Sequence, residues 1–315
     1  MSVEAVLQAL VAGLLIGSLY GLMCIGLALI FGIMRVINFA QGEFLMLGMY
    51  AALFIAPVLA GTGAGGAVAG ALAATLLAAP VLFAAGWLIH AAVLGPATRI
   101  RTRSGEAKAQ QAQFIVTLGV SLALQNGAML AFGSGVRTLR TPLAASAWSF
   151  RVPFTEDAEI FVNRARLVSC VIGIALAAGL HLLISRTWIG RALRATADNP
   201  VAAGYMGIDV GRVHRFAFAL GTAVTAAAGA LVALQYPFQP FIGLDFVIVM
   251  YAGVVLGGMG SIGGAFWGGL AIGLVQQAAT LVLPNQLQNV ALFAIFLLIL
   301  FARPQGFFGR SAERT

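Results

Sequence analysis

The sequence predicts an all-α membrane protein that crosses the bilayer many times as one transmembrane domain of residues 1–315. The chain is 61% hydrophobic and only 9% charged, whereas soluble domains carry about 25% charged residues. Charge-poor runs recur along its whole length, and several approach the roughly 20 residues that span a bilayer. Its 39 glycines suit the close packing of membrane helices.

The charge-poor runs give about nine helical elements, with eight to ten possible because boundaries are good to roughly ±2–4 residues. The first run follows Glu4 rather than a basic start, so we expect a retained spanning helix and not a signal peptide. Two runs are shorter than a span, and we expect broken or partly re-entrant elements there. The runs are 5–31, 44–59, 66–94, 114–132, 167–184, 216–234, 246–257, 265–283 and 290–301.

Basic residues orient the chain, because short cytoplasmic loops are enriched in Lys and Arg. They gather in the loop 95–112, the loop 186–214 and the tail 302–315, separated by two and then four of the runs. One orientation satisfies all three stretches, with the N-terminus periplasmic and the C-terminus cytoplasmic. The loop 133–166 is then periplasmic. It carries charges of both signs, and it either docks a partner or is a plain solvated loop.

The composition argues against several function classes. The net charge of +8 is explained by cytoplasmic loops, and the polar surface that nucleic-acid binding needs is missing. Cys24 and Cys170 lie in apolar runs and read as small buried side chains. His90, His181 and His214 are isolated, so we expect neither a metal site nor a catalytic set. The protein is not expected to be an enzyme.

A polar patch between the first two runs is the first candidate functional segment. Asn38, Gln41 and Glu43 are predicted to line a solute path, because polar groups inside a membrane are costly and usually face a cavity or a partner. Gly42 would permit a broken helix there. The alternative is an ordinary interfacial loop in which Arg35 reaches the lipid head groups.

The segment 190–209 is predicted to form a short helix, a turn and a second short helix. Asn199 before Pro200 is an N-cap followed by proline at the first helical position, and Asp209 suits the N-cap of the next spanning helix. Ile189 and Leu193, with Ala197, recur every four residues and predict an amphipathic first helix. Such a surface suits docking of another protein; the alternative is a helix lying flat on anionic lipid.

A glycine-rich stretch, 257–264, joins two of the runs. It resembles a phosphate-binding loop only superficially, since such a loop needs lysine followed by serine or threonine. The single lysine of the chain, Lys108, is followed by alanine. The glycines are expected to allow a tight turn and close helix contact, and any ATP that drives transport must be hydrolysed by another chain. The glycines in question are Gly257, Gly258, Gly260, Gly263 and Gly264.

A few polar residues interrupt the apolar runs. Gln125 and Asn126, and likewise Gln276 and Gln277, either bridge helices or contact the solute, and Gln125 is assigned to the path. Asp245 stands at the start of an apolar run. It is either a residue of the solute path or the N-cap of the helix that begins there.

A faint internal echo suggests duplication, which is common in transporters. Gly42, Met49, Tyr50 and Ala51 match Gly243, Met250, Tyr251 and Ala252 at one offset.

These motifs together resemble the branched-chain amino acid ABC-transporter permeases of the LivH type. The segment GLALIFGIMRVINFAQGEFLMLGMY at 26–50 is similar to the family form GLxxxFGxxxxINxAHGExxMxGAY. The segment 190–216 resembles the family's cytoplasmic loop, and VVLGGMGSIGGAFWGG at 254–269 its glycine-rich segment. Asn38, Gly42 and Glu43 match the signature. Gln41 departs from it, since histidine is common there, and Arg35 stands where a small or apolar residue is expected.

The resemblance implies an importer of the bacterial inner membrane, with a fold similar to vitamin- and ribose-type importer permeases. It implies a second homologous permease, two ATPase subunits that carry ATP and magnesium, and a periplasmic binding protein, with no cofactor bound by this chain. Solutes would be branched-chain amino acids or related amides, urea or aromatic acids, moved by alternating access. The residues that would couple to the ATPases are Gly190, Arg191, Arg194, Asp198, Asn199, Pro200, Ala203, Gly204 and Gly207.

The competing hypothesis is a secondary transporter driven by an ion gradient. It requires acidic residues inside the membrane as ion or proton relays. Glu43 and Asp245 are the candidates, and so few acids count against it. An intramembrane enzyme is disfavoured by the lack of catalytic groups.

Overall fold

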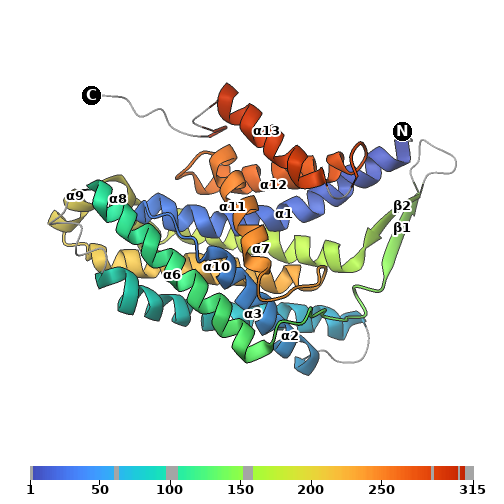
Figure 1. Cartoon of the computed structure of the whole chain (residues 1–315), viewed down its shortest axis with the longest axis horizontal. Helices are drawn as coiled ribbons and strands as arrows, with labels where there is room; N and C mark the ends of the chain where they lie inside the picture. The colour runs from blue at the N-terminus through green and yellow to red at the C-terminus, as the bar shows by residue number, and fades with distance from the viewer. Residues whose placement is uncertain are drawn as a thin grey trace.

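The computed structural model describes residues 3–59, 64–96, 106–151, 159–284, 287–303 and 306–308. Every predicted run is a helix there, and Figure 1 shows the long helices lying side by side in one bundle. Residues 97–105 and 152–158 of the predicted loops, and most of the tail 302–315, lie outside the described residues. The elements are α1 (Val3–Met34), α2 (Gln41–Leu59), α3 (Ala64–Ile89), the π-helix η1 (His90–Leu94), α6 (Glu106–Phe132), β1 (Ala147–Arg151), β2 (Glu159–Asn163), α7 (Arg164–Arg186), α8 (Trp188–Asp198), α9 (Pro200–Tyr205), α10 (Val210–Val232), α11 (Ile242–Gly257), α12 (Ile262–Ala279) and α13 (Gln288–Ala302).

Among the described residues, six helices are long and apolar enough to cross a membrane. They are α1, α2, α3 continued by η1, α6, α7 and α10. Helices α11 and α13 have 16 and 15 residues and remain shorter than a span, as the sequence predicts. The polytopic helical fold is thereby confirmed.

Side-chain caps fix where several helices begin, because the first N–H groups of a helix have no partner within it. Asn163 accepts hydrogen bonds from the backbone at the start of α7, and Thr187 does so at the start of α8. Ser261 caps α12. The predicted caps Asn199 of α9 and Asp209 of α10 are confirmed.

The bundle contains two three-helix units, α1–α2–α3 and α10–α11–α12. The first helix of each unit packs along the last helix of the other unit. Helix α1 lies antiparallel along α12, where Gly17 meets Leu270 and Gly21 meets Phe266. Helix α10 lies along α3 in the same way, where the Thr222 hydroxyl donates to the Leu82 carbonyl at 3.3 Å. This arrangement is what a duplication with inverted topology produces, and it supports the repeat suggested by the sequence.

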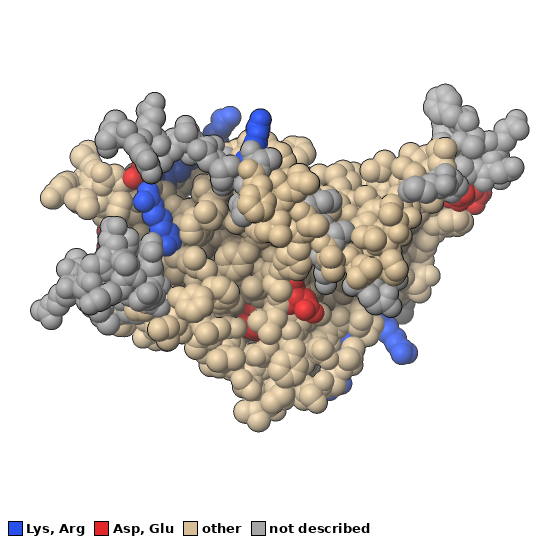
Figure 2. Space-filling model, turned by 45° about the horizontal axis from the view of Figure 1, so that its top comes forward, with Lys and Arg blue, Asp and Glu red and all other residues tan. Residues whose placement is uncertain are grey.

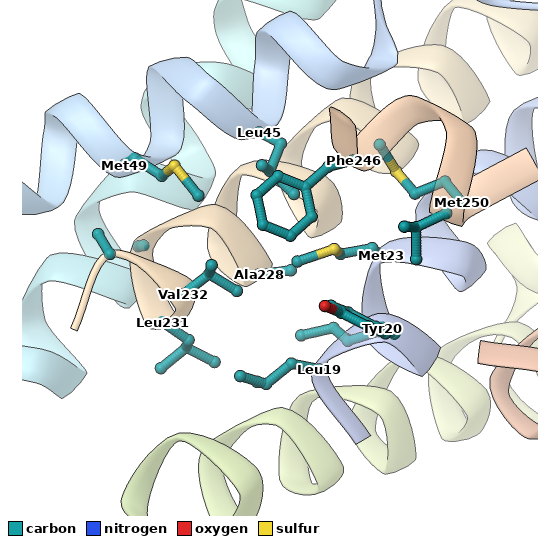
Figure 3. Close-up of a cluster of buried hydrophobic side chains, with 14 of the residues drawn as sticks. Leu19, Tyr20, Met23, Leu45, Met49, Ala228, Leu231, Val232, Phe246 and Met250 are labelled. Carbon is teal, nitrogen blue, oxygen red and sulfur yellow. The ribbon is translucent and has the colours of Figure 1, made fainter. Parts of the chain in front are cut away.

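The core between the two units comes from four helices. Figure 3 shows Leu19, Tyr20 and Met23 of α1 facing side chains of the other three. These deeply buried side chains form the contact surface between the two units, since close packing is what holds membrane helices together. The others labelled are Leu45 and Met49 of α2, Ala228, Leu231 and Val232 of α10, and Phe246 and Met250 of α11.

The loop 133–166 contains a β-hairpin that the sequence did not predict. Strands β1 and β2 pair antiparallel, with Ala147 opposite Asn163 and Arg151 opposite Glu159. The side-chain amide of Gln8 on α1 exchanges two hydrogen bonds with the backbone of Phe161, at 2.6 and 3.0 Å. The hairpin is therefore tied to the start of α1 by an amide that imitates a neighbouring strand.

The surface has an apolar middle and charged ends. Figure 2 shows Lys and Arg side chains toward opposite ends of the visible face, while the middle is mostly uncharged apart from small patches of Asp or Glu. Large apolar side chains such as Leu130 and Ile115 of α6 are 86% and 67% exposed. A face of this kind is stable against lipid, which does not need to be met by polar groups.

Candidate functional site

The turn between α1 and α2 folds its polar residues into the protein interior. Asn38 and Gln41 are completely buried and Glu43 is 1% exposed. The Asn38 amide donates to the Gln41 side-chain oxygen at 2.9 Å, and the Asn38 oxygen accepts from the Ala40 N–H at 3.1 Å. Asn38 therefore shapes the entry into α2. The polar side chains of the turn point inward, whereas Arg35 is exposed, as the interfacial-loop alternative expects of that residue.

Gln41 ties the same turn to α10. Its amide nitrogen donates to the Gly221 carbonyl at 3.2 Å and to the Thr225 hydroxyl. With Asn38 donating to its oxygen, Gln41 has protein partners on both sides of the amide. It is one of the two signature departures, and here it joins the two three-helix units.

The helix break lies at residues 35–40, and Gly42 itself is helical. The sequence interpretation placed the break at Gly42, which is wrong. A side chain at Gly42 would collide with the carbonyl of Gly243 in the first turn of α11. Glycine is needed there because the beginnings of α2 and α11 touch.

Glu43 is the buried acid of this region. One carboxylate oxygen accepts a hydrogen bond from the Ser121 hydroxyl of α6 at 3.2 Å, and the other oxygen, Oε2, is buried without a hydrogen-bond partner. The side chain lies in the first turn of α2, where the unpaired N–H groups of the helix favour an anion. A buried oxygen without a partner is the kind of group that a bound ligand satisfies.

Helix α6 presents a polar stripe to Glu43. Gln113, Thr117, Ser121 and Gln125 recur every four residues and are all at most 7% exposed. The Thr117 hydroxyl donates to the Ile37 carbonyl at 3.2 Å, while the amide nitrogens of Gln113 and Gln125 are buried without partners. We call these four residues with Glu43 the polar seam; along α6 it extends about 18 Å at about 1.5 Å per residue.

Glu43 and Gln125 were predicted from the sequence as path residues, whereas the other three members of the polar seam were not. Their signal was the four-residue spacing of polar side chains within an apolar helix. Gln113 lies near the start of the fourth predicted run, outside its bounds of 114–132. Helix α6 begins at Glu106 instead, so the whole stripe is helical.

Asp245 does not join the polar seam. It lies in the first turn of α11 and is exposed, as are its neighbours Leu244 and Ile248, which are 51% and 45% exposed. Glu43 therefore points into the protein, whereas Asp245 lies on an exposed apolar face. Both acids lie in the first turns of equivalent helices, although the repeat pairs Glu43 with Leu244 and not with Asp245. Their surroundings differ.

Helices α8 and α9 form the predicted short helix pair at the end of the bundle opposite the β-hairpin (Figure 1). Asn199 accepts from the N–H groups of Val201 and Ala202, both at 3.0 Å. Asp209 accepts from the Arg212 N–H and forms an ion pair with its guanidinium at 2.8 Å. These contacts fix where α9 and α10 begin.

The predicted apolar face of α8 needs one correction. Ile189 is 41% exposed, while Gly190, Leu193 and Thr196 are buried. The reason is the contact with the end of α7: a side chain at Gly190 would collide with the Ile184 carbonyl, which also accepts from the Arg194 guanidinium. Among the other predicted coupling residues, Ala203 is buried, Gly207 has a positive φ of 82°, and Arg191, Asp198, Asn199, Pro200 and Gly204 are exposed.

The glycine-rich stretch forms the expected tight turn. Gly258 and Gly260 have φ of 96° and 95°, a region that favours glycine. Gly257 of α11 packs directly on Gly264 of α12, so a side chain on either would meet backbone of the other. Gly263 has open space around it.

A helical fold that crosses the membrane repeatedly and encloses a polar seam is typical of a membrane transport protein. Residues 9–302 match the family described as branched-chain amino acid transport system / permease component, and the chain belongs to this family. It is the permease component of an ABC importer for branched-chain amino acids or related solutes, a non-catalytic membrane subunit.

Relatives of known name agree with the family. The chain is 32% identical to the high-affinity branched-chain amino acid transport system permease protein BraD of Pseudomonas aeruginosa, and the match covers 96% of both chains. It is 31% identical to LivH of Escherichia coli, again over 96% of both. It is 26% identical to the ribose import permease protein RbsC of Haemophilus influenzae, over 79% of this chain and 75% of the relative. No solved structure matches the chain significantly.

Proposed function

We propose that this permease passes a branched-chain amino acid along the polar seam of α6 and α2. The single observation that carries the proposal is the set of buried groups without partners: Oε2 of Glu43 and the amide nitrogens of Gln113 and Gln125. The carboxylate suits the ammonium group of an amino acid, and the amide N–H groups suit its carboxylate. The named substrates of the relatives BraD and LivH support this choice of solute.

We infer that α8 and α9 dock an ATPase subunit. Trp188, Tyr205 and Met206 are 69%, 87% and 83% exposed at a charged end of the molecule. Exposed aromatic and methionine side chains that rise from polar surroundings are typical of protein contacts. The complete importer would contain two such ATPases, a second homologous permease and a periplasmic binding protein, with ATP and magnesium on the ATPases only.

The charges support one orientation in a bacterial inner membrane. Arg186, Arg191 and Arg194 lie at the end that carries α8 and α9, and by the positive-inside rule they support a cytoplasmic position for that end. The N-terminus and the β-hairpin lie at the opposite end (Figure 1), which is then periplasmic. The hairpin is a suitable contact for the binding protein.

The contacts of α8 supply a route for alternating access. Gly190 and Arg194 fix α8 to the end of α7, so a pull on α8 moves α7 with it. Helix α6 touches mainly α2 and η1, and it is thus the least constrained wall of the polar seam. ATP-driven closure of the ATPases would favour one arrangement of these helices over the other.

A paired substitution tests the path. In proteoliposomes with the ATPases and the binding protein, Gln125→Leu should reduce leucine uptake about tenfold, one lost charge-assisted hydrogen bond being worth about 1.4 kcal/mol. The matched control is Asn126→Leu, because Asn126 is exposed and donates only to the Leu122 carbonyl of its own helix. Equal uptake by the two variants would remove α6 from the path.

A further inference from the structure

A cavity lies away from the polar seam, at the end of the bundle that carries α8. It has a volume of about 690 Å³ and opens between the end of α1, the end of α7, α8 and the glycine-rich turn. The proposed path does not use it. Its position, next to the helix proposed to dock the ATPase, makes its occupant relevant to coupling.

The polar part of this cavity carries charges of both signs. Arg35 follows α1, Arg194 and Asp198 lie one turn apart on α8, and His181 belongs to α7. Arg194 also donates to the Ile184 carbonyl. Among the described residues, neither Arg35 nor Asp198 has an ion-pair partner within 4.0 Å. The cavity therefore offers a cation and an anion that have no ion-pair partner in the described part of the chain.

Aliphatic side chains form a large part of the remaining wall, beside Ser185, Ser261 and Phe308. Leu29 and Ile33 of α1, Leu193 of α8 and Ile262 of α12 line it. Leu193 is 2% exposed and Leu29 is completely buried, so the wall is part of the packed bundle. A ligand that fits both parts has two opposite charges and a branched aliphatic group.

Arg35 is held at this cavity in an unusual conformation. Its φ is 53°, and it is the one described residue other than glycine with a positive φ. Its N–H donates to the Phe31 carbonyl at 2.8 Å and ends α1. Glycine is the usual residue at such a helix end, so an arginine held there against its backbone preference suggests that the side chain serves a purpose.

We propose that this cavity binds a free zwitterionic amino acid with an aliphatic side chain from the cytosol, as a feedback site for the released cargo. The proposal rests on the proposed function, which makes such an amino acid the cargo. The ligand carboxylate meets Arg35 and its ammonium meets Asp198, whereas a phosphate has no cationic group to pair with Asp198. Because the ligand contacts α1, α8 and the glycine-rich turn together, it stabilises their present arrangement and slows the transport cycle.

The test uses the complete transporter in proteoliposomes preloaded with leucine on the side of the ATPases. Preloading should slow the initial uptake of labelled leucine by the unaltered protein. Arg35→Gln should leave uptake into empty vesicles unchanged and raise the internal leucine concentration for half-inhibition about tenfold, the effect of about 1.4 kcal/mol. Arg186→Gln is the matched control, an exposed arginine at the end of α7 that does not line the cavity, and it should be inhibited like the unaltered protein.

Further measurements distinguish a zwitterionic amino acid from a plain anion as the ligand of the cavity. Preloading with 4-methylpentanoate, which is leucine without its amine, should inhibit at least tenfold less, because Asp198 then lacks its partner. Equal inhibition by this acid, or inhibition that follows the anionic lipid content of the vesicles instead of leucine, would make the cavity a plain anion site and overturn the proposal.

Two further variants distinguish failure of the feedback site from failure of the transport path. Glu43→Gln should abolish uptake yet retain leucine binding to the purified transporter without its binding protein, and Asp198→Asn should weaken that binding. Normal uptake by Glu43→Gln would refute the path alone. Unchanged inhibition in Arg35→Gln, no inhibition of the unaltered protein, or loss of uptake by Arg35→Gln into empty vesicles would each refute the feedback site.

Discussion

Gly42 of α2 lies directly against Gly243 of α11, so that the first turns of the two helices touch. The two glycines occupy equivalent positions in the two three-helix units, and they match in the sequence echo. Glu43 follows the first glycine and reaches Oγ of Ser121, while Asp245 near the second is exposed. This contact joins the first turns of the two units, and of the two acids near it only Glu43 belongs to the polar seam.

Gly42→Ala should destabilise the protein, because its methyl group would collide with the Gly243 carbonyl. Overpacking of this kind costs about 1–3 kcal/mol, which should lower the midpoint of thermal unfolding in detergent. Gly119→Ala on α6 is the matched control, since nothing lies within 4 Å of the added methyl group and alanine favours a helix. A midpoint for Gly42→Ala equal to that of Gly119→Ala would contradict the close contact.

Ser121→Ala should impair transport without unfolding the protein. It removes the hydrogen bond that Ser121 donates to one carboxylate oxygen of Glu43. The loss of a partner for this buried oxygen costs about 1–3 kcal/mol. The measurement is leucine uptake in proteoliposomes, expected to fall about tenfold. Ser146→Ala, whose hydroxyl donates to loop carbonyls near the hairpin, should transport normally; the same loss in both variants would point to general damage.

Local chemistry explains which features the sequence predicts. Asn199 and Asp209 cap helices through contacts with residues two or three positions away, so their role is visible in the sequence. Runs of apolar residues likewise locate the helices, because the bilayer demands them. The beginning of α6 was harder, because residues 106–113 are polar and helical.

Tertiary contacts explain what the sequence did not reveal. Ile189 was expected on the buried face of α8, but the contact of Gly190 with Ile184 rotates that face away. The β-hairpin depends on pairing between segments separated by residues 152–158. It also depends on Gln8 near the start of α1, which is distant in sequence. The unpaired oxygen of Glu43 is likewise a property of the assembled helices.

Tyr205→Ala should weaken coupling to the ATPase. Tyr205 is 87% exposed at the end of α9, and truncating a buried interface aromatic commonly costs 2 kcal/mol or more, which is about thirtyfold in affinity. Solute-stimulated ATP hydrolysis by the reconstituted importer should fall accordingly. Phe161→Ala in the hairpin, 55% exposed at the opposite end, should leave ATPase docking intact. Tight docking by Tyr205→Ala would move the interface away from α9.

Gln8→Leu should release the β-hairpin from α1. The substitution removes both hydrogen bonds to the Phe161 backbone, each worth about 0.5–1.5 kcal/mol. The Phe161 amide should therefore exchange its hydrogen roughly tenfold faster or more, as hydrogen–deuterium exchange mass spectrometry of peptides covering β2 would show. Exchange in α7 should be unaffected, because Asn163 still caps that helix through Ala165 and Arg166. Uptake that requires the binding protein is measured in the same variant. If this uptake falls while ATPase docking persists, the hairpin is the surface on which the binding protein docks.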